Sequence, residues 1–366
     1  MKQSARQILI GLNLIRELTP HRRNLLLDRF RSPQAIWGAS EADLAALPGF
    51  SEIARVIADA HREEALDHEI KEAKRLGIRI VTLLDSDYPR LLREIENPPL
   101  VLYTRGEVEI DTARTLAIVG TRRTSGYGRG MAKRLAHDLG ALGLNVVSGL
   151  AIGIDAAAHR GALDAKGRTV AVLGSGFLHP YPASNKRLLD EIGRSGTVVS
   201  EYPLDTHPAK WTFPQRNRII AGLSRGVIVV EAPQRSGALI TARLALEEGR
   251  EVFAVPGNVT STASAGTNRL IKDGATLVES VEDILFEFPD LNQLITPSKG
   301  KTEAVLATLT DEQRRVYDLV GLEPLHIDDI ISRGEFSPTG AAHILLLLQM
   351  ENLIQEVDGR RYIRKP

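Results

Sequence analysis

A glycine-rich segment, residues 120–130, has the residue types and spacing that suit phosphate binding. It follows an apolar run at 115–120 and precedes a helical pattern at 127–142. Free amides at the start of a helix, together with the helix dipole, attract anions. The segment begins with Gly120, Thr121, Arg122 and Arg123. Because the two arginines leave the carboxyl end of a predicted strand, we expect them to point into a crevice at that edge of the sheet.

A second segment, His207 to Arg218, interleaves three cations with two aromatic residues and has no acid. Cations can follow the phosphates of an unpaired strand while its bases stack on aromatic rings, at about 1–3 kcal/mol per base. The candidate contacts in this segment are Lys210, Trp211, Phe213, Arg216, Asn217 and Arg218. The alternative is that Trp211 and Phe213 are core residues that hold a loop in place.

Further phosphate-binding candidates follow other predicted strands. Ser236 is a natural N-cap after the run at 226–232, and Gly237 permits close approach to the helix start. Lys186 supplies charge after the loop at 173–182. Several such sites on one edge predict a polyanion larger than one nucleotide as the ligand. Lys133 and Arg134, further along the helix at 127–142, we interpret as a solvated face.

The sequence lacks the residues that several other kinds of site require. The chain has no cysteine, which excludes disulfides, thiol nucleophiles and Cys-ligated zinc. Neither the P-loop motif nor the dinucleotide spacing G-x-G-x-x-G occurs at these turns. Asp155 and His159 lie one helical turn apart and form either an acid–base pair or a dipole-stabilising carboxylate with a neighbour. No nucleophile accompanies them, so we expect no catalytic residue, metal or cofactor.

The elements that must position these loops alternate in type. Short apolar runs at 79–84, 100–106, 115–120, 144–149, 169–174, 197–202, 226–232 and 251–257 predict strands. Helical patterns separate them from residue 115 on, at 127–142, 155–166, 185–194, 214–223 and 237–248. This order predicts an α/β fold with an extended Rossmann-like parallel sheet covered on both faces. Right-handed crossovers then place every strand-to-helix loop along one edge.

The flanks predict two smaller modules. Residues 1–75 have helical periodicity, and the turn at 47–51 resembles a helix-hairpin-helix element, although we favour a purely structural small helical domain. After the sheet domain at 76–288, the polar stretch 289–302 reads as a linker. Residues 303–366 predict three helices and a hairpin at Asp358-Gly359, the pattern of a winged helix. Its third helix has no Lys or Arg between Pro338 and Glu351. A role in partner binding or positioning therefore fits this helix at least as well as contact with a DNA groove.

Length and charge set the outer limits. A chain of 366 residues is long enough for two or three domains, and 46 Lys+Arg balance 46 Asp+Glu. Zero net charge excludes a uniformly basic nucleic-acid coat but not local basic patches. No apolar run approaches the roughly 18 residues of a membrane span, so we expect a soluble, cytoplasmic protein.

Seven motifs in order carry a family resemblance: AIVGTRR, SGLAIGIDAAAH, VLGSG, PQRNRIIAGLS, EAPQRSGALITARLALEEGR, VFAVPGN and GTNRLIKDGA. Together they resemble the DNA-processing protein A (DprA/Smf) family, densely over 76–288 and more loosely in both flanks. The resemblance implies single-stranded DNA binding without cleavage, in natural transformation and DNA recombination. It implies a RecA-type recombinase and single-strand-binding protein as partners, a homodimer, and a sterile-alpha-motif-like N-terminal domain.

The family's contact residues carry over by position. Its Gly-[Ser/Thr]-Arg motif falls on Gly120, Thr121 and Arg122, and its basic pocket falls on Lys210, Phe213, Arg216, Asn217 and Arg218, with Ser236 and Gly237 beside it. The alternative is a phosphoribohydrolase-like, nucleotide-processing enzyme on the same fold. Such enzymes place a Glu one turn into the late helix, where this chain has Ile240 to Arg243 and no acid before Glu247. That difference favours binding over hydrolysis.

Overall fold

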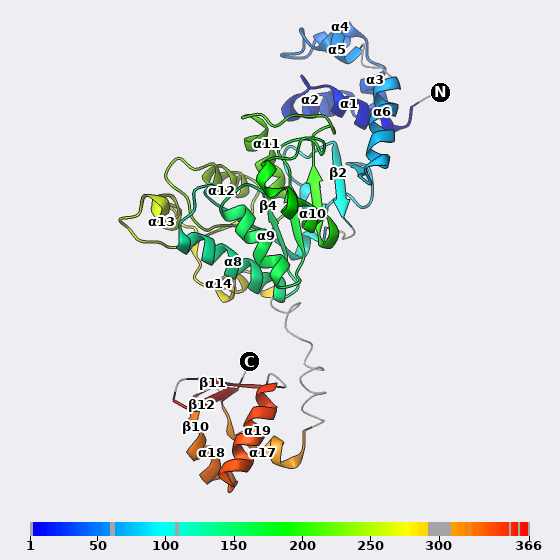
Figure 1. Cartoon of the computed structure of the whole chain (residues 1–366). Coiled ribbons are helices and arrows are strands. Elements are labelled where there is room, and N and C mark those ends of the chain that lie inside the picture. The colour runs from blue at the N-terminus through cyan, green and yellow to red at the C-terminus, as the bar shows by residue number, and fades with distance from the viewer. Residues whose placement is uncertain are drawn as a thin grey trace. The chain divides into compact units, whose positions relative to one another are not determined.

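The computed structural model describes residues 3–58, 63–106, 110–291, 309–321, 323–350, 353–357 and 359–364. It forms two compact units, Met1–Phe288 and Pro289–Pro366, which we describe separately (Figure 1). The predicted linker at 289–302 falls mainly outside the described residues, and the boundaries 1–75, 76–288 and 303–366 stay predictions. No helix in the described part of the chain is long and apolar enough to cross a membrane.

The first unit contains a nine-stranded sheet in the order β1-β2-β6-β5-β4-β3-β7-β8-β9. The strands are β1 Arg79–Thr82, β2 Val101–Gly106, β3 Thr115–Val119, β4 Asn145–Ser148, β5 Thr169–Val172, β6 Thr197–Ser200, β7 Gly226–Val229, β8 Glu251–Ala254 and β9 Thr276–Leu277. From β6 to β9 all neighbours are parallel, as predicted. The sheet is not parallel throughout, however, because β1 pairs antiparallel with β2, and β2 with β6.

The helices cover both faces of the sheet. One set follows β3, β4 and β5: α8 Gly126–Ala141, α9 Ile154–Asp164 and α10 Lys186–Ser195. The other set follows β6, β7 and β8: α11 Thr212–Gly222, α12 Gly237–Glu247 and α13 Ala265–Lys272. The chain runs outward from β3 to β6 and then crosses back to β7, beside β3. Right-handed crossovers in opposite directions place the two sets on opposite faces. Ala117 and Val119 of β3 accordingly pack in one cluster with residues of α11 and α12.

The N-terminal helices share a core with the sheet. They are α1 Ala5–Leu14, α2 Pro20–Phe30, α3 Pro33–Trp37, α4 Glu41–Ala45, α5 Ala54–Ala58 and α6 Glu63–Arg75. Ile8 and Leu12 of α1 belong to the same buried cluster as Tyr103 of β2 and Leu188 of α10. The turn at 47–51 between α4 and α5 contains Gly49 at φ +76°, a left-handed conformation that favours glycine. These helices therefore belong to the first compact unit.

The second unit is a winged helix, as the sequence predicts. Its elements are α17 Asp311–Leu319, β10 Leu325–His326, α18 Ile327–Gly334, α19 Pro338–Met350, β11 Ile354–Val357 and β12 Arg361–Arg364. The strands form a sheet in the order β10-β12-β11. Val316, Ile330, Leu345 and Tyr362 meet in its own buried cluster, so the unit has an independent core.

Candidate nucleic-acid interface

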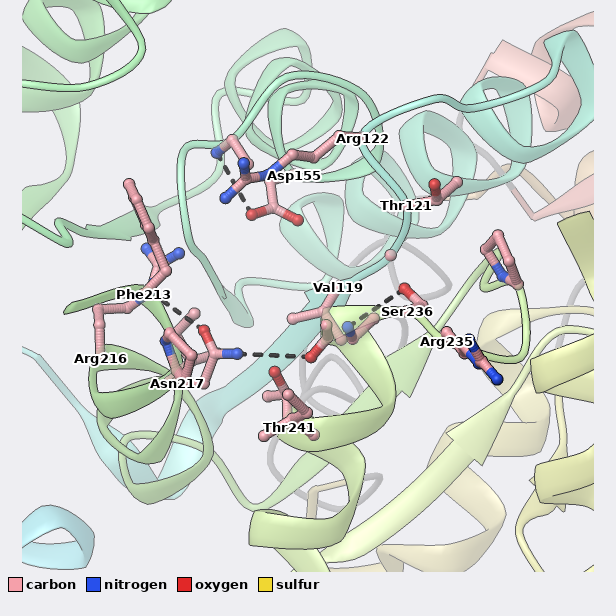
Figure 2. Close-up of a pocket in the computed structure, with 18 of the residues that line it drawn as sticks. Val119, Thr121, Arg122, Asp155, Phe213, Arg216, Asn217, Arg235, Ser236 and Thr241 are labelled. Atoms are coloured by element: carbon pink, nitrogen blue, oxygen red, sulfur yellow. Dashed lines mark hydrogen bonds between the residues drawn. The ribbon is translucent and has the colours of Figure 1, made fainter. Parts of the chain in front are cut away.

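The candidate site lies where two neighbouring strands send their helices to opposite faces. β3 and β7 are adjacent and parallel, with Ile118 opposite Ile228. The loop after β3 leads to α8 on one face, and the loop after β7 leads to α12 on the other. Ligands of doubly wound sheets bind in the crevice at such a switch point. A pocket of about 700 Å³ opens there (Figure 2).

The structure brings ten of the thirteen predicted site residues to this pocket. Its walls come from the loop after β3, the entry to α11 and the start of α12, and the predicted residues among them are Gly120, Thr121, Arg122, Arg123, Lys210, Phe213, Arg216, Asn217, Ser236 and Gly237. Sequence reasoning did not select Tyr181 or Arg235, which also line it. Both follow a strand run, in loops already singled out for other residues, and that position is the signal that could have found them.

A buried carboxylate holds the loop that carries Arg122 and Arg123. Glu231, only 2% exposed, follows β7. Its Oε2 accepts hydrogen bonds from the Thr124 hydroxyl and the Ser125 amide, both at 2.8 Å. Its backbone carbonyl accepts from the Thr121 amide at 2.7 Å. Sequence reasoning missed this role, and the available signal was an acid at the end of an apolar strand.

Two rings and a guanidinium form an aromatic cluster in the pocket wall. The Arg122 guanidinium carbon lies 5.0 Å from the centre of the Phe213 ring, and the Tyr181 ring lies 5.6 Å from Phe213. A Cβ at Gly174 would lie 2.7 Å from the Phe213 ring, so glycine there lets the ring approach the loop after β5. Phe213 is half-buried and lines the pocket, so it is neither a core residue nor a free surface ring.

Arg216 is a buried cation in the pocket wall. It is 4% exposed, and its Nη1 donates to the backbone carbonyls of Gly149, at 2.7 Å, and Val172. Burial lowers its pKa to about 10, which Asp155 opposes. Burial likewise raises the pKa of Asp155, against the attraction of Arg216 and Arg122. Arg216, predicted as a DNA contact, is therefore a buried charge held in place by carbonyls at the ends of β4 and β5.

The start of α12 forms the opposite wall. Ser236 caps the helix by accepting a hydrogen bond from the Ala238 amide at 3.3 Å. Asn217 of α11 donates to the Gly237 carbonyl at 3.5 Å, which ties the two walls together (Figure 2). A Cβ at Gly237 would meet nothing within 4 Å, so space remains for a ligand at this positive helix end.

Two family models match the chain, the DNA recombination-mediator protein A model over residues 79–289 and the DprA winged helix domain model over 300–360. This chain belongs to the DNA recombination-mediator protein A family. It is 44% identical to the DNA processing protein DprA of Bacillus subtilis, over 59% of this chain and 73% of that relative. It is 32% identical to Protein Smf of Synechocystis, over 97% and 96% of the two chains.

Solved structures of the family agree with the fold. The DprA crystal structure from Streptococcus pneumoniae superposes with a TM-score of 0.66 at 38% identity, over 79% of this chain and 99% of that one. The Helicobacter pylori protein, whose structure was solved to explain its single-stranded DNA binding mode, gives 0.52 at 32% identity, over 59% and 96%. The family resemblance inferred from the seven motifs is thus confirmed.

Three predicted contact residues of this family member lie outside the pocket. Arg218 is 8% exposed, and its Nη2 lies 2.6 Å from Glu201, whose same oxygen lies 2.9 Å from Arg23. We therefore withdraw Arg218 from the candidate site, because a buried ion pair occupies its charge. Trp211 is 56% exposed and lines a separate cavity of about 180 Å³ beside α1 and α2. Lys186 is exposed at the start of α10.

Asp155 and His159 do not form the acid–base pair that was one interpretation of their spacing. His159 is fully buried, and its Nδ1 lies 2.7 Å from the Thr169 hydroxyl oxygen. That hydroxyl donates to the Val146 carbonyl, so Nδ1 is the protonated nitrogen and donates to Thr169. Nε2 is buried and has no hydrogen-bond partner among the described residues, and burial lowers the His159 pKa to about 3. A neutral histidine that faces Thr169 has a structural role.

One group of side chains in the described part of the chain suits a metal ion. The ligand atoms of His179, Asp205 and His207 lie within 4.8 Å of one another. His179 Nε2 lies 2.7 Å from Asp205, and the two imidazole rings stack at 3.6 Å. The group lies outside the lining of the pocket between β3 and β7. Two imidazoles and a carboxylate would favour a transition metal such as zinc over magnesium.

Proposed function

We propose that this protein binds single-stranded DNA in the pocket between β3 and β7 and delivers it to a RecA-type recombinase, as a mediator rather than an enzyme. The observation that carries the proposal is the convergence of exposed cations, aromatic rings and a helix N-terminus on one crevice (Figure 2). Arg122, Arg123 and Lys210 are exposed and form no ion pair among the described residues. They remain free to contact phosphates.

The rings favour an unpaired strand. Phe213 and Tyr181 line the same pocket as these cations, 5.6 Å apart. A base can stack on such a ring only after it has left the duplex, and each stacked base contributes about 1–3 kcal/mol. The single-stranded DNA binding of the Helicobacter pylori relative supports the same ligand class.

The pocket gives little support to the phosphoribohydrolase alternative. Among the described residues, Asp155 is the only carboxylate in its lining, and that side chain is buried and accepts a hydrogen bond from the Ala151 amide. The start of α12 contributes Gly237, Ala238, Ile240 and Thr241 to the lining, and none of these residues is an acid. With no exposed carboxylate to activate water, the pocket is suited to binding.

The remaining partners rest on family membership. A RecA-type recombinase, a single-strand-binding protein and a second copy of this chain are the partners that we propose, with the cytoplasm as the location. A role in natural transformation and in general recombination places the same demands on the pocket.

The test combines Arg122→Ala and Lys210→Ala in one variant. The control variant replaces Lys74 and Arg194, two exposed cations outside the pocket lining, with alanine. If each lost cation contacts one phosphate, the slope of log K against log salt for oligo-dT decreases by about 1.4 in magnitude. Fluorescence anisotropy across salt measures it, with blunt duplex expected to bind more weakly. Unchanged affinity and slope in a folded pocket variant would refute the assignment. Release of free base from nucleoside monophosphates would instead support the phosphoribohydrolase-like alternative.

A further inference from the structure

A second hollow begins where the pocket between β3 and β7 ends. It has a volume of about 500 Å³ and shares Arg122 and Arg123 with the pocket as a common wall. From there it extends to cations of α8 and α9, namely Arg129, Lys133 and Arg160. We call it the α8–α9 cleft.

Small residues keep this cleft open. Gly153, Ala156 and Ala157 line it together with the cations, and their small side chains leave space between them. The loops on either side are held together, because the Ile154 amide donates to the Thr121 carbonyl at 3.3 Å and a Cβ at Gly153 would collide with that carbonyl. The cleft is therefore held in position relative to the pocket.

The charge of the cleft is one-sided. The described residues that line it include five cations and no carboxylate. Arg122, Arg123 and Arg129 form no ion pair among the described residues, whereas Lys133 and Arg160 pair at 2.7 Å with Asp164 and Glu191, outside the lining. Both pairs are about half-exposed, and exposed pairs contribute at most about 1 kcal/mol. A phosphate can thus replace either carboxylate at little cost.

We propose that the α8–α9 cleft binds the sugar–phosphate backbone of the same DNA strand where it leaves the pocket. The inference rests on the proposed function and extends it from one pocket to a track. In the part of the chain that the structure describes, no aromatic ring lines the cleft, so it offers charge without base stacking and takes backbone of any sequence. Lys133, interpreted from sequence as part of a solvated face, becomes a binding residue of the track.

Oligonucleotide length separates the cleft from the pocket. Arg129→Ala combined with Arg160→Ala is compared with the Lys74→Ala, Arg194→Ala control on oligo-dT of 6 and 20 nucleotides. We expect the variant to bind the 6-mer within twofold of the wild type. On the 20-mer its salt slope decreases by about 1.4, so that raising salt from 50 to 200 mM costs the wild type about sevenfold more affinity than it costs the variant.

The outcomes distinguish the two proposals. Equal losses on both lengths, or no loss on either, overturn the track. A larger loss on blunt duplex than on the 20-mer assigns the cleft to duplex DNA and also overturns it. If the wild type binds neither oligonucleotide, the proposed function itself is refuted.

A cross-linking experiment tests the same track in a folded protein without removing any charge. Because the chain has no cysteine, Ala156→Cys in the cleft and Ile240→Cys in the pocket wall each accept a single photoreactive label. We expect the pocket label to cross-link both lengths and the cleft label to cross-link the 20-mer at least fivefold more than the 6-mer. A cleft label that fails on the 20-mer, or that captures both lengths equally, contradicts the track.

Discussion

Arg122 and Arg218 make a paired test of how this protein divides its cations between binding and folding. Both were candidates for DNA contact from sequence, but Arg122 is exposed at the pocket whereas Arg218 is buried against Glu201. We predict that Arg122→Ala weakens binding of single-stranded DNA and leaves stability nearly unchanged. Arg218→Ala should do the reverse.

The magnitudes follow from the contacts. Removing one partner of a buried ion pair costs about 3–5 kcal/mol, because the other charge stays buried and unpaired. Here Arg23 remains 2.9 Å from Glu201, so we take the lower end, about 3 kcal/mol, for Arg218→Ala. Unfolding entropy is about 2.1 cal/mol/K per residue, or about 0.6 kcal/mol/K for the Met1–Phe288 unit, which gives a Tm lower by about 5 °C.

Arg122→Ala removes an exposed cation and its contact with the Phe213 ring, worth about 0.5–1 kcal/mol. The Tm should therefore fall by less than about 2 °C, while the salt slope on oligo-dT decreases by about 0.7. Circular dichroism melts and fluorescence anisotropy on the same preparations measure both quantities. The reasoning is refuted if Arg218→Ala melts with the wild type but loses affinity, or if Arg122→Ala melts about 5 °C lower.

Three further predictions concern His159, Glu231 and the second unit. Between pH 7 and 5 the first unit should lose about 2 kcal/mol of stability through His159, because its folded pKa of about 3 lies below the unfolded value of 6.5 and its stabilising contribution is lost as pH falls. In urea melts across that range, the free energy of unfolding should depend less on pH in His159→Gln than in the wild type. The same pH dependence in both proteins would contradict the assignment. Glu231→Ala should lower the free energy of unfolding by about 1–3 kcal/mol and weaken DNA binding, because the Ser125 amide loses its acceptor. Glu231→Gln retains an acceptor oxygen and serves as the control. Equal DNA affinities of the two variants in anisotropy would argue against this role of Glu231 in the loop. Removal of the chain after Phe288 should leave 6-mer affinity within twofold, and a larger loss would show that the second unit contributes to the pocket.

The parallel part of the sheet was predictable and its edges were not. Apolar runs alternating with helices from residue 115 on leave one economical arrangement, a parallel sheet with helices on both faces. Nothing in the runs at 79–84 and 100–106 reveals direction, because direction depends on which strand each run joins. Strand β9 has only two residues, Thr276 and Leu277, too few for any periodicity.

The pocket was predictable because all its loops follow strands, and the carboxyl ends of parallel strands share one edge. The sequence could not predict that Arg216 lines the pocket whereas Arg218 lies outside it, because this difference depends on partners remote in sequence. Arg218 meets an acid 17 residues earlier, and Arg216 meets the Gly149 carbonyl 67 residues earlier. Composition shows that a cation is present, but only the fold shows whether that cation already forms an ion pair with a carboxylate.

Two acids, Glu201 and Glu231, illustrate how the same local pattern gives different results. Each follows an apolar strand and is 2% exposed. Glu201 accepts from two guanidiniums and removes them from any ligand, whereas Glu231 accepts from a hydroxyl and an amide and leaves Arg122 exposed. Burial of a carboxylate is costly unless hydrogen bonds satisfy it, so each acid determines the structure around it. A pocket that binds DNA of any sequence needs exposed cations with unused charge, and Glu231 supplies order to their loop without neutralising them.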